Sequence, residues 1–477
     1  MADFEYDVAF LGAGPGGYVG AIRARQLGLK VLVVEKDKAG GVCLNIGCIP
    51  SKALIDRATK FRSLEELARF GVHADLGAFS YAAVQETSRA AADKLSKGVD
   101  YLLKKNGVEY LVGEGRLVGA HELIVKKPDG AEKKVTAHSV IVATGSSPRV
   151  VSGFEFDEER VLSSTGFLMM KKLPKRMVIL GAGAIGMEAA YIMNSFGVQV
   201  TVVEMLARIL PMEDAEAASV VRSAFEKRGV TFLTETKAFS LDRPAKGPLV
   251  VSLGPSAAQA ATEKLEAEAV LVAIGRAPNT AELGLEALGV RLDRGYVEVG
   301  DWYETAASGV YAIGDIVAGE PQLAHVASAQ AELAVERISS LLGKGPTPHE
   351  KRVEARFIPT AVYCEPQVAG FGPREEALKA AGRAYKAAKF PYVGIGKAVA
   401  IGAPEGFTKV LTDPRTGEIL GAAIVGAEAT ELVHELLLAA RTELTMEEIA
   451  ATVHAHPTLS ESVKELSLAS LGRAIHV

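Results

Sequence analysis

Cysteine is scarce in this sequence, and its scarcity excludes one class of protein. Only 3 cysteines occur among 477 residues, too few for a scaffold that is held together by disulfides. Neither sign of charge dominates, because 53 Lys and Arg residues stand against 58 Asp and Glu residues, a net charge of −5. This balance predicts neither nucleic-acid binding nor attachment to an anionic membrane.

Long apolar runs are also missing. No run approaches the ~18 residues that a membrane-spanning helix needs. The first residues do not form a basic region followed by an apolar stretch and a cleavage site; residues 6–11 instead read as a buried strand. We therefore expect a cytoplasmic protein, or a matured chain in an equivalent compartment, with no membrane span. Its length predicts three or four domains.

One pattern occurs twice in this chain: an apolar strand, a glycine-rich turn, a helix, and a second strand that ends in an acid. In both copies the acid lies 23 residues after the first glycine. The members of the first copy are Gly12, Gly14, Gly17 and Glu35, and those of the second are Gly181, Gly183, Gly186 and Glu204.

Each residue type in this pattern has a physical reason. The first glycine permits the tight turn, the second lets the backbone approach a pyrophosphate, and the third lets the helix pack closely on the strand. The phosphates then meet free N–H groups at the positive end of the helix. The acid accepts hydrogen bonds from a ribose diol. Two complete copies therefore predict two dinucleotide-binding sites.

Three further apolar runs support this division. Residues 139–145 and 269–275 end at Gly145 and Gly275, and each would complete a sheet after its own copy of the pattern. Residues 309–315 end at Asp315, on the edge of a parallel sheet where ligands bind. From about Arg356 the pattern changes to alternating strands and helices, which predicts a separate α+β domain.

Cys43 and Cys48 begin eight residues after Glu35, so a dithiol would lie beside a bound dinucleotide. Residues five apart on a straight helix are too far separated for a disulfide, so the segment must bend, and Asn45 and Gly47 permit this. Alternatives are two structural cysteines or a zinc site. The third cysteine, Cys364, is distant and is read as a small buried hydrophobe.

The segment Gly-Gly-Val-Cys-Leu-Asn-Ile-Gly-Cys-Ile-Pro-Ser-Lys, residues 40–52, resembles the active-site motif of the pyridine nucleotide–disulfide oxidoreductase family. Both glycine patterns, the Gly314-Asp315 segment and a C-terminal His-Pro motif occur in the order typical of that family. The resemblance covers essentially the whole chain. It implies an α/β fold with two Rossmann-like dinucleotide-binding domains, for FAD and NAD, and a C-terminal α+β dimerisation domain.

The resemblance also implies roles for the first half of the site. Glu35 would hold the FAD adenosine ribose, and Asp315 the ribityl chain. Cys48 would be the thiol nearer the flavin and Cys43 the thiol that exchanges with substrate. Lys52 would lie near the reactive flavin nitrogen and pair with Glu188. No metal site is expected.

Glu204 indicates which second nucleotide is used. A carboxylate at the end of the second strand accepts from a ribose 2′-OH and repels a 2′-phosphate, which favours NAD over NADP. Arg208, the one cation that follows it closely, is read as a surface residue.

The C-terminal motif supplies a candidate base. His456 precedes proline in residues 454–461, and histidine is a suitable general base near neutral pH. The resemblance assigns the base to His456, contributed by the partner subunit of a homodimer, and its orienting carboxylate to Glu461. Glu461 also fits a helix capping box with Thr458. His454 is expected to be structural, and His325 is left without an assigned role.

The resemblance implies FAD-dependent oxidation of protein-bound dihydrolipoamide with NAD, within a 2-oxo acid dehydrogenase or glycine-cleavage complex. The implied partners are lipoyl domains and the subunit-binding domain of an acyltransferase core. The rival functions are another NAD(P)H-disulfide reductase of the family and a noncatalytic assembly subunit. We expect an FAD-binding domain over residues 1–148, an NAD-binding domain over 149–275, a central domain over 276–347 and an interface domain over 348–477.

Overall fold

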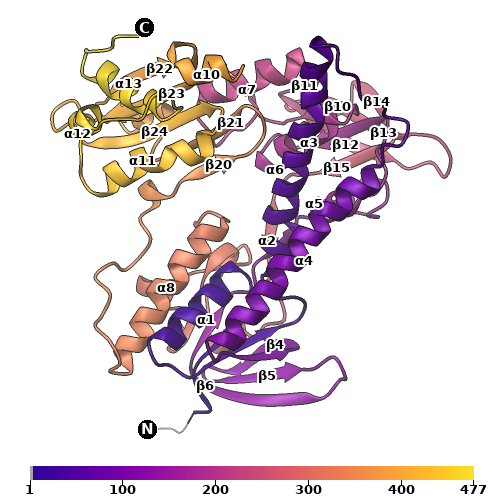
Figure 1. The fold of residues 1–477 in the computed structure, drawn as a ribbon. Helices are drawn as coiled ribbons and strands as arrows, with labels where there is room; N and C mark the ends of the chain where they lie inside the picture. The colour runs from indigo at the N-terminus through magenta and orange to yellow at the C-terminus, as the bar shows by residue number, and fades with distance from the viewer. Residues whose placement is uncertain (1–3, 477) are drawn as a thin grey trace. The chain divides into compact units, whose positions relative to one another are not determined.

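Two parallel sheets, each containing a strand that enters a glycine-rich turn, organise the chain (Figure 1). The computed structural model describes residues 4–476 and divides into two compact units. The first unit comprises Met1–Ala53, Ala83–Arg149 and Gly275–Val353, and the second comprises Leu54–Ala82, Val150–Ile274 and Glu354–Val477.

The sheet of the first unit has seven strands in the order β3-β2-β1-β6-β5-β4, with β19 also paired to β6. Strands β1, β2, β3, β6 and β19 pair in parallel, whereas β4 and β5 add an antiparallel extension to β6. The bounds are β1 Tyr6–Leu11, β2 Val31–Glu35, β3 Glu109–Val112, β4 Glu114–Gly119, β5 Glu122–Lys126, β6 Glu132–Val142 and β19 Val310–Ala312.

Strand β1 is apolar at nearly every position because both faces of this sheet are buried. Phe10 and Val8 point to a core built with helices α1 (Pro15–Gln26) and α8 (Ala324–Leu341), which lie side by side in Figure 1. Ala9 and Leu11 point to the opposite core, with the antiparallel extension. Alternating residues thus serve two cores, as expected for a parallel strand with both faces covered.

The second unit contains a five-stranded parallel sheet in the order β11-β10-β9-β15-β8 and an antiparallel sheet of β12, β13 and β14. Helix α7 starts at an N-cap, Asp214, whose carboxylate accepts from the N–H groups of Glu216 and Ala217. The bounds are β8 Val161–Leu162, α5 Ser164–Met169, β9 Arg176–Leu180, α6 Ala184–Ser195, β10 Gln199–Val203, α7 Ala215–Lys227, β11 Thr231–Leu233, β12 Thr236–Asp242, β13 Leu249–Pro255, β14 Glu263–Ala267 and β15 Ala269–Val272.

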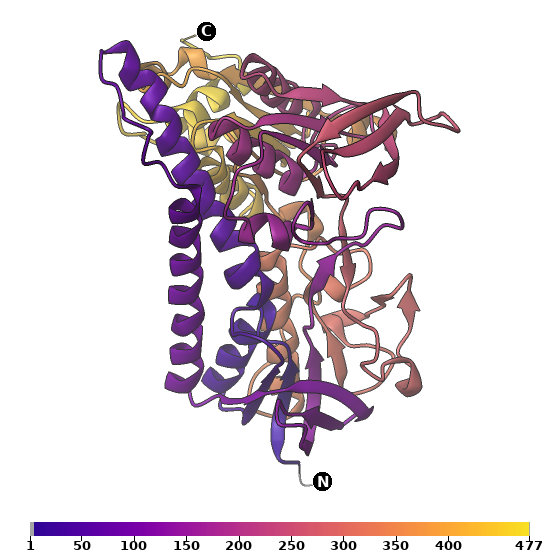
Figure 2. The same ribbon diagram turned by 90° about the vertical axis from the view of Figure 1, so that its right-hand side faces the viewer.

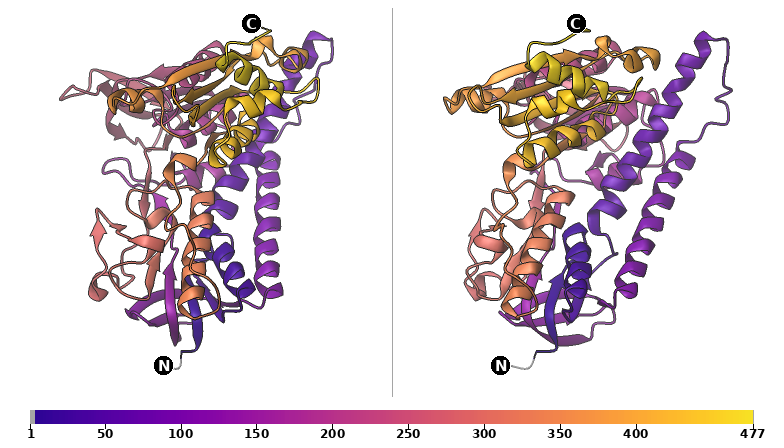
Figure 3. Two further views of the ribbon diagram at one scale, coloured as in Figure 1. Left: turned by 90° about the vertical axis from the view of Figure 1, so that its left-hand side faces the viewer. Right: turned by 60° about the vertical axis from the view of Figure 1, so that its left-hand side comes forward.

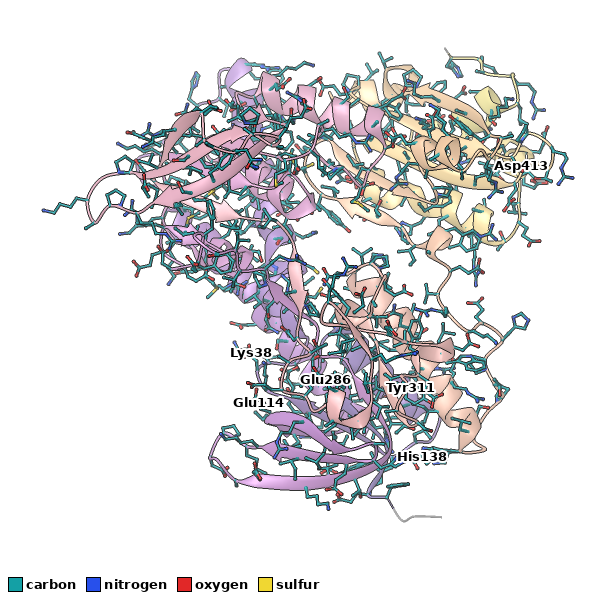
Figure 4. All side chains as sticks on the ribbon, turned by 180° about the vertical axis from the view of Figure 1, so that it is seen from behind. Lys38, Glu114, His138, Glu286, Tyr311 and Asp413 are labelled. Carbon is teal, nitrogen blue, oxygen red and sulfur yellow. The ribbon has the colours of Figure 1, made fainter. Side chains whose placement is uncertain are left out.

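The C-terminal part of the second unit has an antiparallel sheet in the order β20-β21-β24-β23-β22. Helix α11 packs on β21 and β24, and α13 on β22 and β23 (Figure 3). Asp413, labelled in Figure 4, lies in the turn between β23 and β24. The bounds are β20 Thr360–Val362, β21 Gln367–Phe371, α9 Glu375–Ala380, β22 Lys386–Pro391, α10 Gly396–Ala400, β23 Phe407–Thr412, β24 Ile419–Gly426, α11 Ala429–Arg441, α12 Met446–Ala451 and α13 Glu461–Ser470.

Helices and short elements complete the chain. Helix α4 is long and unbroken, as Figure 2 shows. No helix within residues 4–476 is long and apolar enough to cross a membrane. The remaining bounds are α2 Gly41–Ile46, α3 Cys48–Arg69, α4 Tyr81–Lys105, β7 Ser146–Pro148, β16 Arg276–Pro278, β17 Leu292–Asp293, β18 Tyr296–Val297, η1 Glu286–Leu288, η2 Asp301–Tyr303, η3 Gly314–Ile316, η4 Ala355–Phe357 and η5 Tyr392–Gly394.

The predicted strands are present. β1 spans residues 6–11 as expected. The apolar run at 139–145 overlaps the end of β6, and the runs at 269–275 and 309–315 contain β15 and β19. The change of pattern after Arg356 corresponds to the antiparallel sheet that starts with β20. The predicted α/β fold with two parallel sheets and a C-terminal α+β part is confirmed.

Candidate active site

The two cysteines lie on either side of a break between two helices. Cys43 is in α2, and Cys48 is the first residue of α3. The break falls at Gly47, where a Cβ would lie 2.9 Å from the carbonyl oxygen of Val42, so only glycine permits the close approach. Both cysteines are partly exposed. The bend predicted between them is therefore present.

Polar contacts fix the dithiol loop. The Asn45 side-chain amide donates to the carbonyls of Ala39 at 3.1 Å and Gly41 at 2.9 Å. From α4, an Arg89 guanidinium N–H donates to the Asn45 carbonyl at 2.7 Å and the Ser96 hydroxyl to the Ala39 carbonyl at 2.8 Å. Asn45 was expected to supply an unusual backbone conformation, but it lies within α2 and acts through its side chain.

The surroundings of Cys43 disfavour its thiolate form. The hydrogen bond with Cys48 and then burial raise the pKa of Cys43, whereas the positive charge of Lys52 acts in the opposite direction. Lys52 lies four residues after Cys48 in α3, one helical turn further on. A raised pKa disfavours the thiolate, which is the nucleophilic form of a cysteine.

The three glycines of the first turn have the three predicted geometries. Gly12 has φ +107°, and a Cβ there would lie 2.3 Å from the Ala143 carbonyl oxygen. A Cβ on Gly14 would have no neighbour within 4 Å, so the surface of this residue is open to a ligand. A Cβ on Gly17 would lie 1.9 Å from the Gly12 carbonyl oxygen. Helix α1 starts without a side-chain cap, leaving its N–H groups available for phosphate.

Glu35 is held in place by the backbone. One carboxylate oxygen accepts the N–H of Ala13 at 2.7 Å and the other that of Asp37 at 2.9 Å. Only 9% of the residue is exposed. Each oxygen retains a lone pair that a ribose hydroxyl can use. These contacts make a rigid acceptor beside the turn, which fits the adenosine ribose of a dinucleotide.

Asp315 belongs to a polar network inside the first unit. The hydroxyl of buried Ser146 donates to its carboxylate, and the Arg276 Nε–H donates to that hydroxyl at 2.7 Å. The fully buried Gln330 side chain accepts the N–H of Gly314 at 2.7 Å. Burial lowers the pKa of Arg276, while the charges of Asp315 and Cys48 oppose this. The network orients Asp315 at the end of β19.

The second turn repeats the first. Gly181 has φ +100°, and a Cβ there would lie 2.5 Å from the Ala273 carbonyl oxygen. Gly183 has open space, and a Cβ on Gly186 would lie 2.0 Å from the Gly181 carbonyl oxygen. Gly145 and Gly275, which follow β6 and β15, have φ values of +68° and +115° and no neighbour within 4 Å of a Cβ. These positions are open, but each needs glycine for its conformation.

Glu204 is anchored as Glu35 is. Its oxygens accept the N–H groups of Ala182 at 2.8 Å and Leu206 at 2.9 Å. Arg208, which was predicted to be a surface residue, has a side chain that is 34% exposed. Its guanidinium forms an ion pair with Glu376 of α9.

Glu188 is buried in α6. One carboxylate oxygen accepts the N–H of Tyr363 at 3.2 Å. Neighbouring Cys364 is fully buried, and burial together with the charge of Glu188 raises its pKa well above the ordinary value. The interpretation of Cys364 as a small buried hydrophobic residue is thus confirmed. Lys52 and Glu188 belong to different units, and their pairing stays a prediction.

The C-terminal histidine and its carboxylate are in contact. His456 Nδ1 and a Glu461 oxygen are 3.0 Å apart, and the His456 side chain is 77% exposed. The other Glu461 oxygen accepts the N–H of Thr458 at 2.8 Å. Partial burial raises the pKa of Glu461, but the Thr458 N–H and His456 outweigh it and leave the pKa below its ordinary value. The N-cap of α13 is Ser460, so Thr458 does not occupy the predicted cap position.

His454 has a different environment. Its Nε2 faces a Glu435 oxygen at 2.9 Å, its Nδ1 faces the Thr452 carbonyl at 3.1 Å, and only 5% of the side chain is exposed. Both ring nitrogens meet acceptors, which suits a structural histidine. His325 is exposed near the start of α8.

The contacts of Arg89, Ser146, Arg276 and Glu376 were not predicted. Arg276 directly follows Gly275, and Ser146 follows Gly145, so their position next to candidate ligand-binding glycines was a usable signal. Arg89 and Glu376 act across long sequence separations, which sequence spacing does not reveal. Within residues 4–476 no group of three or more His, Cys, Asp or Glu side chains could hold a metal ion.

Comparison with known proteins gives matches over nearly the whole chain. A model described as pyridine nucleotide-disulphide oxidoreductase matches residues 6–331, and one for the dimerisation domain of such proteins matches 358–467. The chain is 43% identical to a dihydrolipoyl dehydrogenase of Chlorobaculum tepidum, covering 98% of this chain and 97% of the relative. It is 42% identical to a dihydrolipoyl dehydrogenase of Corynebacterium glutamicum, covering 99% of both.

Two solved structures are similar to this chain over nearly its whole length. The crystal structure of LpdA from Mycobacterium tuberculosis aligns with a TM-score of 0.88 at 29% identity, covering 96% of this chain and 98% of that one. The HOCl-induced flavoprotein disulfide reductase RclA from Escherichia coli aligns with a TM-score of 0.84 at 24% identity, covering 97% and 99%. The second likeness concerns the fold alone.

Proposed function

We propose that this chain, which belongs to the pyridine nucleotide-disulphide oxidoreductase family, oxidises protein-bound dihydrolipoamide to lipoamide with FAD as cofactor and NAD as acceptor. The predicted family and fold are thereby confirmed, and the dimerisation domain implies a homodimer. The dihydrolipoyl dehydrogenases of two bacteria cover almost the full chain at 42–43% identity, which favours this activity over the others of the family.

The observation that carries the proposal is the continuity between the first turn and the dithiol. The N–H of Gly40 donates to the carbonyl of Ala13 at 2.8 Å, so the loop that follows Glu35 returns to the glycine-rich turn. Helix α2, with Cys43, starts at the next residue. The thiol pair would thus lie in a segment that is hydrogen-bonded to the turn that holds the cofactor.

The residues of the first unit fit FAD. Gly12, Gly14 and Gly17 with the uncapped start of α1 would hold the pyrophosphate, Glu35 the adenosine ribose, and Asp315 the ribityl chain. Gly145 leaves open space on the same sheet edge. FAD, when bound, supplies a carrier for two electrons between a dithiol and a nicotinamide.

The dithiol performs the exchange with substrate. One substrate thiolate forms a bond to the Cys43 sulfur and breaks the Cys43–Cys48 disulfide, which leaves Cys48 as a thiolate. The second substrate thiolate then attacks the sulfur bonded to Cys43, closes lipoamide and releases Cys43. Of the two protons lost by the substrate, one ends on Cys43 and the other on His456. Reoxidation of the dithiol yields one NADH and one free proton per NAD.

His456 is the proposed base, and Glu461 its orienting carboxylate. A neutral histidine near the exchange thiol would deprotonate a substrate thiol, whose ordinary pKa is ~8.5. Its exposed side chain is available to a second subunit, and we place it in the partner's dithiol site. Lys52 would favour the thiolate of Cys48 and pair with Glu188.

The second unit fits NAD. Gly181, Gly183 and Gly186 would hold its pyrophosphate and Gly275 would leave room beside it. Glu204 would accept a hydrogen bond from the ribose 2′-OH, and it would repel a 2′-phosphate.

Partners and organisation follow the same proposal. The substrate arm would be a lipoyl domain, and the subunit-binding domain of an acyltransferase core would hold the enzyme in a 2-oxo acid dehydrogenase or glycine-cleavage complex. We propose four domains, with boundaries after residues 148, 275 and 347.

Anaerobic titration of the holoenzyme with dihydrolipoamide tests the proposal. We expect a long-wavelength absorption band from a thiolate beside oxidised flavin, followed by reoxidation with NAD. Cys48→Ser should abolish both the band and turnover while retaining FAD.

Cys364→Ala is the matched control, because that thiol lies in the second unit and is buried. It should retain both signals. A noncatalytic assembly subunit would show no NAD-linked turnover in any variant, and normal turnover of Cys48→Ser would contradict the dithiol mechanism.

A further inference from the structure

The loop that follows Glu204 is tied twice to one residue of the second turn. Glu204 accepts the N–H of Ala182, and the N–H of Leu210 donates to the carbonyl of Ala182 at 2.8 Å. Arg208 lies between these two anchors. The segment that contains Arg208 is therefore tied at both ends to the turn that would carry the NAD pyrophosphate.

The Arg208 side chain is engaged elsewhere. One terminal nitrogen forms a short contact with a Glu376 oxygen, and the other is 3.2 Å from the second oxygen of that carboxylate. The second nitrogen also donates to the carbonyls of Pro211 at 3.1 Å and Glu213 at 3.4 Å. This two-pronged pairing is the geometry that Arg uses for carboxylates and phosphates alike.

The choice between NAD and NADP depends on what lies near the ribose 2′ position. A 2′-phosphate is recognised by a guanidinium that is free to bind it. Arg208 is the only Lys or Arg in residues 204–214. A carboxylate that already holds this guanidinium competes directly with a 2′-phosphate for the same donors.

We propose that Glu376 is a specificity-determining residue, which favours NAD because it engages Arg208 and keeps that cation from a ribose 2′-phosphate. The inference rests on the proposed NAD site. Glu204 disfavours the 2′-phosphate by repelling it at the ribose. Glu376 disfavours it by pairing with Arg208, so that this cation does not bind the phosphate. Sequence spacing alone assigns only the first effect.

The pair is suited to mutation because other contacts hold the loop. Arg374 and Glu213 form an ion pair at 2.8 Å with side chains 15% and 8% exposed, and Lys409 pairs with Asp214 at 3.0 Å with both side chains 5% exposed. Arg208 and Glu376 are 34% and 50% exposed, and an exposed pair of this kind contributes little to folding stability. Removal of Glu376 should therefore leave the second unit folded.

The test compares Glu376→Ala with the double variant Arg208→Ala/Glu376→Ala, each as the holoenzyme. We expect Glu376→Ala to raise kcat/KM for NADP about five-fold, equivalent to ~1 kcal/mol, and to leave that for NAD within about two-fold. The gain should disappear in the double variant. Glu405→Gln is the control, because Glu405 forms a comparable exposed pair with Lys227 at 2.9 Å.

Binding gives a readout that does not depend on turnover. Calorimetric titration with adenosine 2′,5′-bisphosphate should show about five-fold tighter binding to Glu376→Ala than to the unaltered protein. The same two titrations can be repeated with Glu204→Ala added to each protein, which removes the repulsion of the phosphate. Both proteins should then bind adenosine 2′,5′-bisphosphate more tightly, and the roughly five-fold ratio between their affinities should be unchanged.

Three results would overturn the inference. They are unchanged NADP use in Glu376→Ala, an equal gain without Arg208, and an equal loss for both nucleotides, which would mean that Glu376 only positions the loop. Preference for NADP in the unaltered enzyme, or no nucleotide-linked turnover, would instead contradict the proposed function.

Discussion

In each glycine-rich unit the acid, Glu35 or Glu204, accepts the N–H of the residue after the first glycine and the N–H two residues beyond itself. All four distances lie between 2.7 and 2.9 Å. The third glycines, Gly17 and Gly186, approach the first glycine's carbonyl so closely that a Cβ would lie about 2 Å away (1.9 and 2.0 Å). We call the three glycines of each turn, together with the acid that follows them, a nucleotide-binding frame. The two frames are therefore nearly the same.

The loops that follow the two acids diverge. Both return to the turn through a residue in the left-handed region, Gly40 at φ +89° and Leu210 at φ +45°. After Gly40 the chain enters the helix with Cys43, and α4 holds this loop. Lys38, labelled in Figure 4, is 3.7 Å from Asp93 of α4. After Leu210 the chain enters a network of ion pairs with the C-terminal part.

This difference indicates how one binding frame serves two purposes. The frame supplies rigid acceptors and open N–H groups, which recognise any dinucleotide. The residues that follow the acid decide the chemistry: a dithiol in the first unit, and nucleotide selection in the second. Substitutions within the frames should therefore remove one cofactor each, whereas substitutions in the loops should change reactions.

The largest expected effect is the loss of FAD in Gly17→Ala. The added Cβ would overlap the Gly12 carbonyl, and the backbone must move at a cost of about 3 kcal/mol. We expect this variant to purify without flavin. Gly186→Ala should retain FAD and its reduction by dihydrolipoamide but raise the Michaelis constant for NAD at least about ten-fold, since 1.4 kcal/mol is already a factor of ten.

The control for both is Gly98→Ala in α4, where a Cβ has no neighbour within 4 Å. A glycine within a helix is less favourable than alanine by about 0.5–1 kcal/mol, so this variant should keep both cofactors and be slightly more stable. Flavin absorbance and NAD kinetics measure the outcome. Equal loss of both cofactors in Gly17→Ala and Gly186→Ala would refute the independence of the two frames.

The next effect separates electron input from electron output. His456→Gln should lower turnover with dihydrolipoamide by about 10²–10⁴-fold, because the substrate thiol loses its base. Reduction of the flavin by NADH should persist, since that step uses the second unit. Stopped-flow absorbance measures both directions.

His454→Gln is the comparison variant. Its ring meets Glu435 and the Thr452 carbonyl and is almost fully buried, so the expected cost is in stability, with turnover changed much less than in His456→Gln. Similar turnover losses in the two variants would remove His456 as the specific base.

Much of this organisation could be predicted from the sequence. The repeated glycines and the spacing to Glu35 and Glu204 specify the frames because each position has a strict local requirement. The contacts of Arg208 and Arg89 could not be predicted, since their partners lie in distant segments that only the tertiary fold brings together. Leu210 also gave no signal, because its left-handed conformation is imposed by its hydrogen bond to Ala182 and not by its residue type.

The smallest expected effect concerns the charge of Glu375, which contributes to holding the loop after Glu204. Glu375 pairs with Lys409 and accepts from the Tyr385 hydroxyl at 2.7 Å. Burial raises the pKa of Glu375, but these partners outweigh it and lower the pKa to about 2. Because this value lies below that of an unfolded Glu, the stabilisation is complete above about pH 4.5 and is lost as the pH falls towards 2.

We therefore expect Glu375→Gln to lower the free energy of unfolding by about 1–2 kcal/mol at pH 7, with the difference from the unaltered protein shrinking as the pH falls towards 2. Scanning calorimetry across this range measures the difference. Trp302, the only tryptophan, lies in the first unit, and its fluorescence at pH 7 should be the same in both proteins. A difference that persists unchanged at pH 3 would mean that the charge of Glu375 does not stabilise the loop after the second frame.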